Sequence, residues 1–240
     1  MQATKRRQRA GLTAMAVLMG ALLAAGGGCQ GDGPALAAQE GRGEPVDLRD
    51  AFGEEAVTGT YRMAAGPLEG EDVAFSIPAV ASGQDEAVMT VEGVREMTWR
   101  RDEQGAVMIL ETTDHLEQVR VVYEPALMVV PARMRVGEVR QQEVEMNVYR
   151  LDDGSRRAGG SGTIEVELIS AGRFDTPMGR VEGFHVRERH DLHLSLARVN
   201  VQVDTIYGRD MGPVRKSTLR RTRALGLFAS EEREVLERVE

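Results

Sequence analysis

Apolar and polar residues alternate with a period of two along most of the chain after residue 57. The clearest run is 163–169 (TIEVELI), where Ile164, Val166 and Leu168 alternate with two glutamates. Successive side chains of a β-strand point to opposite faces of the sheet, so this pattern predicts a strand with one buried and one wet face.

Similar runs predict further strands on both sides of that segment. They lie at 94–101 (with Met97 and Trp99 on one face), 106–112, 116–123, 181–187 (with Phe184 and Val186 inward), 192–196, 199–203 and 214–224. Turn residues separate them at 102–105 (DEQG), 173–180 (RFDTPMGR) and 208–213 (GRDMGP), and Gly159, Gly160 and Gly162 are typical of a flexible hairpin end. Short polar connections favour an antiparallel meander.

Helical patterns are confined to two short segments. Residues 47–57 would place Leu48, Ala51 and Phe52 on one side of a helix, and Ser230 would cap a helix over 229–240. The predicted fold class is therefore mainly β (α+β), a curved antiparallel sheet or half-barrel with one or two short helices. The predicted β domain covers residues 46–228 and follows a tether, rich in Gly and Ala, over residues 29–45.

The first 28 residues have the order of parts of a bacterial signal peptide. Four basic residues between Lys5 and Arg9 precede an uncharged run from Gly11 to Ala25, and three glycines then lead to Cys29, the only cysteine. A run of about 15 residues is shorter than the roughly 20 that span a bilayer as a helix. No later segment is long and apolar enough to do so, which excludes a multi-span helical membrane protein.

Two cleavage sites are compatible with this leader, and they predict different locations. Cleavage before Cys29 would lipidate that cysteine and give a membrane-anchored lipoprotein facing the periplasm. Gly26 stands where the bacterial lipobox usually has a large aliphatic residue. Cleavage at Ala35-Leu36-Ala37 would instead release a soluble periplasmic or secreted domain. A single cysteine directly behind the apolar run favours the lipoprotein and excludes a disulfide framework.

Charge limits the partners of the exported domain. Removal of the leader leaves 26 basic and 38 acidic residues, a net charge of −12, so we expect no nucleic-acid binding. Basic residues nevertheless gather between Arg215 and Arg223. This segment is either a strand that faces an anion or a membrane head group, or a solvated edge strand that uses charge to block aggregation.

Three segments carry a resemblance to known proteins. They are Pro131 with 135–137 (RVG), 174–180 (FDTPMGR) and 207–215 (YGRDMGPVR). Over about residues 120–220 the chain resembles a widespread family of exported bacterial β-sheet domains of unknown function. More loosely, its layout is similar to the half-barrel of LolA and LolB, which carry lipoproteins. The resemblance implies a fold and a compartment, and it implies no catalytic residues.

The search for catalytic and metal-binding residues is mostly negative. The sequence lacks a G-x-S-x-G nucleophile motif, and Cys29 would be either lipidated or removed. His185, His190 and His193 stand near Asp191, but positions 190 and 193 would lie on opposite faces of a strand. We therefore predict no enzyme activity, no metal site and no cofactor.

Methionines are common at the predicted strand positions and would line either a core or an adaptable apolar cavity. They include Met89, Met97, Met108, Met128, Met134 and Met146. Two functions remain. The first is binding of a lipid or apolar ligand in the curved sheet. The second is a structural or assembly role in the cell envelope through surface contacts, with no ligand cavity. The sequence identifies neither ligand-binding residues nor a protein partner.

Overall fold

The structure is a computed structural model of the chain. It describes residues 41–53, 55–79, 86–224 and 228–240. The predicted signal peptide, Cys29 and most of the predicted tether lie outside the described residues, and so do both predicted cleavage sites.

The described residues form fourteen strands and one short 3-10 helix, η1. The bounds are β1 Arg42–Asp47, η1 Arg49–Ala51, β2 Val57–Ala65, β3 Asp72–Ile77, β4 Ala87–Val91, β5 Arg95–Arg101, β6 Val107–Asp114, β7 Val119–Val130, β8 Arg133–Val136, β9 Val139–Arg150, β10 Arg156–Thr176, β11 Gly179–Leu194, β12 Ala197–Gly208, β13 Gly212–Ala224 and β14 Phe228–Arg238.

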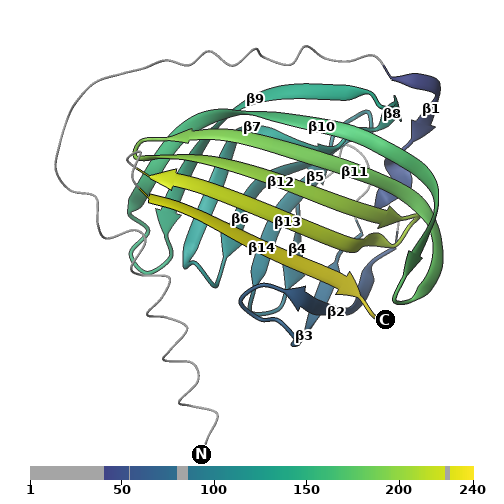
Figure 1. The fold of residues 1–240 in the computed structure, drawn as a ribbon, viewed down its shortest axis with the longest axis horizontal. Coiled ribbons are helices and arrows are strands. Elements are labelled where there is room, and N and C mark those ends of the chain that lie inside the picture. Colours follow the sequence, from purple (N-terminus) through teal and green to yellow (C-terminus); the bar gives the residue numbers. More distant parts are fainter. Residues whose placement is uncertain (1–40, 54, 80–85, 225–227) are drawn as a thin grey trace, which may run out of the picture.

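Twelve strands form a closed antiparallel barrel in the order β10-β11-β12-β13-β14-β2-β3-β4-β5-β6-β7-β9. Strand β9 pairs with both β7 and β10, and β14 pairs with β2. Figure 1 shows the long strands β9 to β14 passing over the shorter strands β2 to β6 at a steep angle. The mainly β prediction is confirmed, but the predicted half-barrel is wrong, because the pairing of β14 with β2 removes the free sheet edges.

The predicted C-terminal helix over 229–240 is wrong, because strand β14 occupies most of that segment. Three of its glutamates lie opposite arginines of β13 and form ion pairs with them, Arg215 with Glu237, Arg220 with Glu232 and Arg221 with Glu231. Opposite charges directly across a ladder stabilise strand pairing. The basic segment 215–223 is therefore an internal strand rather than an edge strand, and neighbouring carboxylates take up much of its charge.

Two predictions near the N-terminal end of the described chain also need correction. The predicted tether over 29–45 extends too far, because Arg42–Asp47 forms β1, which pairs with β8. The helix predicted over 47–57 is reduced to the single turn Arg49–Ala51. The apolar side was identified correctly, since Leu48, Ala51 and Phe52 are all buried.

The strand and turn predictions in the middle of the chain are largely confirmed. The 163–169 run lies in β10 with Ile164, Val166 and Leu168 buried, and 102–105 and 177–178 are turns. The predicted hairpin end at Gly159, Gly160 and Gly162 is wrong, because all three lie within β10. A Cβ on Gly160 would lie 2.0 Å from the backbone oxygen of His193, so glycine permits the close approach of β11.

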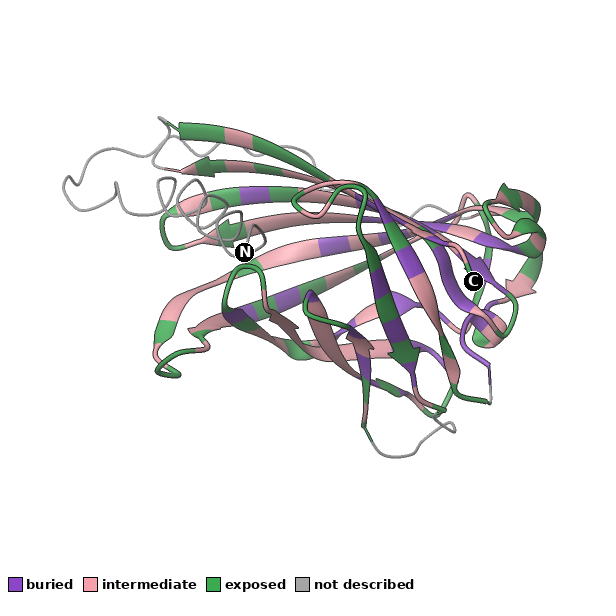
Figure 2. Cartoon of the chain, turned by 90° about the horizontal axis from the view of Figure 1, so that it is seen from below, coloured by how far each residue is buried: buried purple, intermediate pink, exposed green. Residues whose placement is uncertain are grey.

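Buried residues concentrate at one end of the barrel. Figure 2 shows them near the C-terminus of the chain, whereas partly buried and exposed residues dominate the opposite end. At the buried end, residues 48–53 fold beneath the strands, and we call this segment the plug. Its backbone is held by hydrogen bonds from Leu48 N to the Ala132 carbonyl (2.9 Å) and from Asp210 N to the Asp50 carbonyl (2.6 Å).

Candidate functional site

The interior of the barrel is the candidate site, and the register of the strands identifies the side chains that face it. Residues directly opposite each other in a ladder point to the same face. On β13, Lys216 lies between Thr205 of β12 and Leu236 of β14, which are 1% and 6% exposed. The same alternation along β11 turns Phe184, Val186, Glu188 and His190 inward.

An aromatic cluster fills the end of the interior next to the plug. Phe52 lies 5.2 Å from Trp99 and 5.6 Å from Tyr207, measured between ring centroids, and Tyr207 stacks on Phe184 at 5.7 Å. Trp99 belongs to β5 and Tyr207 to β12, which are far apart in the barrel order. Phe52 therefore connects opposite walls and closes this end with apolar side chains.

Arg95 forms two ion pairs in the middle of the interior, and one of them crosses it. Arg95 Nη2 of β5 lies 3.1 Å from Asp114 Oδ2 of β6, and Arg95 Nη1 lies 3.6 Å from Glu234 Oε1 of β14. Strands β5 and β14 are not neighbours, so the second pair spans the barrel. Burial alone would lower the pKa of Arg95, but the carboxylates of Glu234 and Asp114 outweigh it and keep the pKa above its usual value.

Glu188 of β11 is the most buried carboxylate in this region. Its side chain is 8% exposed, and Oε2 lies 3.2 Å from Nε2 of His190, whose side chain is 13% exposed. Two tyrosines lie within reach of its charge. Burial, and to a lesser degree the negative charge of Glu188, raises the pKa of both Tyr123 and Tyr207. Both phenols therefore stay protonated at neutral pH and can donate hydrogen bonds.

Lys216 of β13 also faces the middle of the interior. It differs from Arg95 and Arg220 in its contacts. Within the described part of the chain its ammonium group forms no hydrogen bond or ion pair. Burial, followed by the positive charge of Arg95, lowers the pKa of Lys216, and the charges of Glu188 and Glu234 offset only part of that effect.

Toward the end away from the plug, a second contact crosses the interior. Arg220 of β13 donates to the carboxylates of Glu117, which lies in the turn after β6, and of Glu232 on β14. Several inward-facing apolar side chains of the barrel keep partial exposure and pack against the margin of the core. They are Ala87, Met97, Val121, Leu192 and Leu194. Leu192 and Leu194 lie toward this end, beyond His190 on β11, whereas Ala87 lies opposite Trp99.

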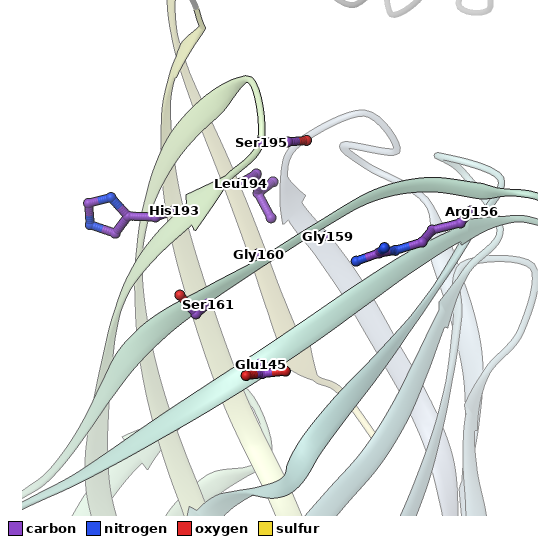
Figure 3. Close-up of a pocket in the computed structure, with 8 residues that line it drawn as sticks. All are labelled: Glu145, Arg156, Gly159, Gly160, Ser161, His193, Leu194 and Ser195. Atoms are coloured by element: carbon purple, nitrogen blue, oxygen red, sulfur yellow. The ribbon is translucent and has the colours of Figure 1, made fainter. Parts of the chain in front are cut away.

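A separate groove with a volume of about 410 Å³ lies at the same end, over strands β9 to β11. Figure 3 shows Glu145, Arg156 and His193 around it, with the side-chain-free Gly159 and Gly160 at its centre. Its lining is mostly polar, and Leu194 is its single apolar side chain. Because this groove is open to solvent and mostly polar, the barrel interior is the better candidate for an apolar molecule.

The histidines singled out in the sequence do not converge. His185 binds Asp204 at 2.8 Å on the outer side of the barrel, His190 faces inward beside Glu188, and exposed His193 lies 3.6 Å from Asp191. Across the ranges that the structure describes, no three His, Cys, Asp or Glu side chains are placed to hold a metal ion. Of the methionines, Met89, Met134 and Met146 are core residues, whereas Met97 lines the partly exposed interior.

Sequence reasoning missed the charged residues of the interior, although two signals were present. Continuing the inward alternation of Phe184 and Val186 by two steps reaches Glu188 and His190. The second signal is compositional. The chain has 30 Lys and Arg residues, and only Lys5 and Lys216 among them are lysine.

Comparisons with known proteins add little to this description. No protein-family model matches the sequence, and no curated protein matches it. A candidate lipoprotein from Parabacteroides distasonis is 9% identical, covers 81% of this chain and 99% of its own length, and has a TM-score of 0.40. A candidate exported protein with a YmcC-like fold from Bacteroides fragilis is 12% identical, covers 78% and 95%, and also has a TM-score of 0.40.

At these similarities, the function of this chain has to be argued from its own residues. Among the described residues, no helix has the length and apolar character needed to cross a membrane. The loose resemblance to LolA and LolB stays a prediction.

Proposed function

We propose that the chain is an exported, non-catalytic envelope protein, anchored by lipid at Cys29, that binds a lipid or another apolar ligand inside its barrel. The observation that carries the ligand proposal is the incomplete burial of the inner wall. Four apolar side chains face the barrel interior, yet the residues packed around them leave them partly exposed. They are Met97, Val121, Leu192 and Leu194. An apolar ligand would gain roughly 25 cal/mol for each Å² of this surface that it covers.

The geometry favours one end of the barrel for ligand entry. The plug and the aromatic cluster around Phe52 occupy the other end. The ligand would therefore lie with its apolar part along the partly exposed wall, and its inner end would reach the charged middle of the barrel.

A structural or assembly role is the second candidate, and one observation favours it. The Arg95–Glu234 and Arg220–Glu117 pairs cross the interior and take up space that a ligand would need. Under this alternative the barrel is a rigid, self-filled body that acts through its outer surface.

Native mass spectrometry of the exported chain, purified from membranes in mild detergent, tests both parts of the proposal. We expect a diacylglyceryl mass increment on Cys29 and a second series of peaks from co-purified ligand, which disappears on denaturation. A Cys29→Ser variant should lose the increment and retain the ligand. An N-terminus after Ala37 would refute the anchor. Ligand-free spectra at every detergent concentration, together with no binding of the neutral apolar dye N-phenyl-1-naphthylamine, would favour the structural role.

A further inference from the structure

Lysine is almost absent from this protein, and its one occurrence in the described chain is inside the barrel. Every other basic residue after Lys5 is arginine. Arginine stays protonated in proteins and pairs well with carboxylates, whereas lysine loses its proton readily when buried. Where a position requires only a cation among carboxylates, arginine is sufficient. Arg95, a few strands away, is such a case.

The surroundings of Lys216 favour the neutral amine. The interior groups that act on its charge are Arg95 from β5, Glu188 from β11 and Glu234 from β14, while Thr205 and Leu236 flank it on the adjacent strands. Glu234 is already paired with Arg95, and Glu188 with His190. Desolvation and a neighbouring cation are the two conditions that activate a lysine as a nucleophile.

The charged groups around Lys216 also favour a neutral ligand head group over an anionic one. A carboxylate or phosphate head group placed on Lys216 would meet the negative charges of Glu188 and Glu234 as well as the cation of Arg95. A neutral carbonyl group meets no such repulsion. The iminium cation that it would form with Lys216 has the same charge as the ammonium group, so the two glutamates would stabilise it.

Resting on the proposed function, we propose that Lys216 binds an apolar aldehyde or ketone covalently as an imine, with the apolar chain of the ligand along the inner wall. The neutral Nζ attacks the carbonyl carbon, and the carbonyl oxygen takes up a proton to give a carbinolamine. The C–O bond then breaks and the oxygen leaves as water. In total, an ammonium group and a carbonyl become an iminium ion and one water molecule. The protons are exchanged with water, and the negative charge of Glu188 favours the cationic intermediate.

Reductive trapping tests the inference. The full chain is incubated at pH 7.5 with decanal and sodium cyanoborohydride, and proteolytic peptides are mapped by mass spectrometry. We expect decyl-Lys216 to form at least tenfold faster in the folded chain than in the same chain unfolded in urea. The Lys216→Arg variant, whose fold is verified by circular dichroism, should form no adduct there. It should still bind decanol, measured by displacement of N-phenyl-1-naphthylamine, within about threefold of the wild type.

The remaining outcomes separate this inference from the proposed function. If decanol binds but Lys216 reacts no faster than in the unfolded chain, imine formation is refuted and apolar binding stands. If decanoate binds at least tenfold more tightly than decanol and Lys216→Met removes the difference, Lys216 is an anion partner, which also refutes the imine. If neither decanol nor the dye binds, the proposed function fails, and the inference fails with it.

Discussion

The charged side chains inside the barrel are held in two different ways. Arg95 has two carboxylate partners that outweigh the cost of its burial. Lys216 has none in direct contact among the residues that the structure describes, and its pKa is lowered. A partly buried cation without a direct partner costs stability whenever it is protonated.

We therefore expect Lys216→Met to stabilise the protein at pH 7 by more than the roughly 0.5 kcal/mol of an ordinary surface substitution, because burial makes the protonated amine less stable in the folded state than in the unfolded chain. The folded state holds the proton of Lys216 less tightly than the unfolded chain does. Between the lowered pKa and the ordinary value of 10.5, the unfolded chain binds more protons, so wild-type stability rises with pH in that window. The extra stability that Lys216→Met confers should therefore become smaller as the pH rises through that window.

Urea unfolding at pH 7 and at pH 10 measures this effect. Arg221→Met on the same strand is the control, because its side chain is 63% exposed and paired with Glu231. It should change the unfolding free energy by less than about 0.5 kcal/mol at either pH. A Lys216→Met protein that is less stable than the wild type at pH 7 would mean that attraction to the glutamates outweighs burial.

The plug shows how a short irregular element can complete a barrel. Only three of its residues are helical, yet Phe52 bridges Trp99 and Tyr207 on opposite walls. Asp50 and Arg209, which form an ion pair, fix the plug from the side of β12. A segment of this kind closes one end without contributing a strand.

Phe52→Ala should cost about 3 to 5 kcal/mol, the usual range for a buried phenylalanine. Trp99 is the only tryptophan in the chain, so its fluorescence reports directly on the plug. We expect a red shift of its emission and a lower urea midpoint. Phe228→Ala is the matched control, because Phe228 is 56% exposed. An unchanged emission maximum in the Phe52 variant would contradict the bridging role.

Local pattern predicted the elements better than it predicted how they pair. The alternation of Ile164, Val166 and Leu168 is a property of one segment, and the structure confirms it. In the 229–240 segment, Val235, Leu236 and Val239 also suit an apolar helical face, and local pattern therefore favours a helix there. Only its partners, the arginines of β13 and the early strand β2, make it a strand. The interior site depends on the same long-range pairing, so sequence alone did not show that Lys216, Glu188 and Arg95 share one interior.

At the scale of the whole molecule, the seam between β14 and β2 decides whether the sheet is a barrel. The seam pairs Leu236 with Met63, Glu237 with Arg62 and Arg238 with Tyr61. The side chain of Arg238 adds bonds near the seam, including one of 2.8 Å to the Met211 carbonyl. Opening the seam would expose two strand edges and the interior at once.

A disulfide can test the seam. In a Cys29→Ser background, cysteines at Arg62 and Glu237, which lie directly opposite each other, should form a cross-link on mild oxidation. The closed loop is long, so we expect the cross-link to stabilise the fold by about 2 to 4 kcal/mol, measured as a raised thermal midpoint that dithiothreitol reverses. Cysteines at Thr58 and Glu237, four positions out of register, should stay reduced. Equal cross-linking of both pairs would contradict the register.

The same seam sets the order in which the protein can acquire its structure. A chain is made from its N-terminus, so β2 is produced early, while its partner β14 lies about 170 residues further on. Until those residues arrive, β2 presents an unsatisfied row of backbone donors and acceptors that can recruit another chain. Closure of the barrel therefore cannot precede the synthesis of β14. A chaperone that holds β2 until β14 is available would have its largest effect on yield, with little effect on the stability of the finished barrel.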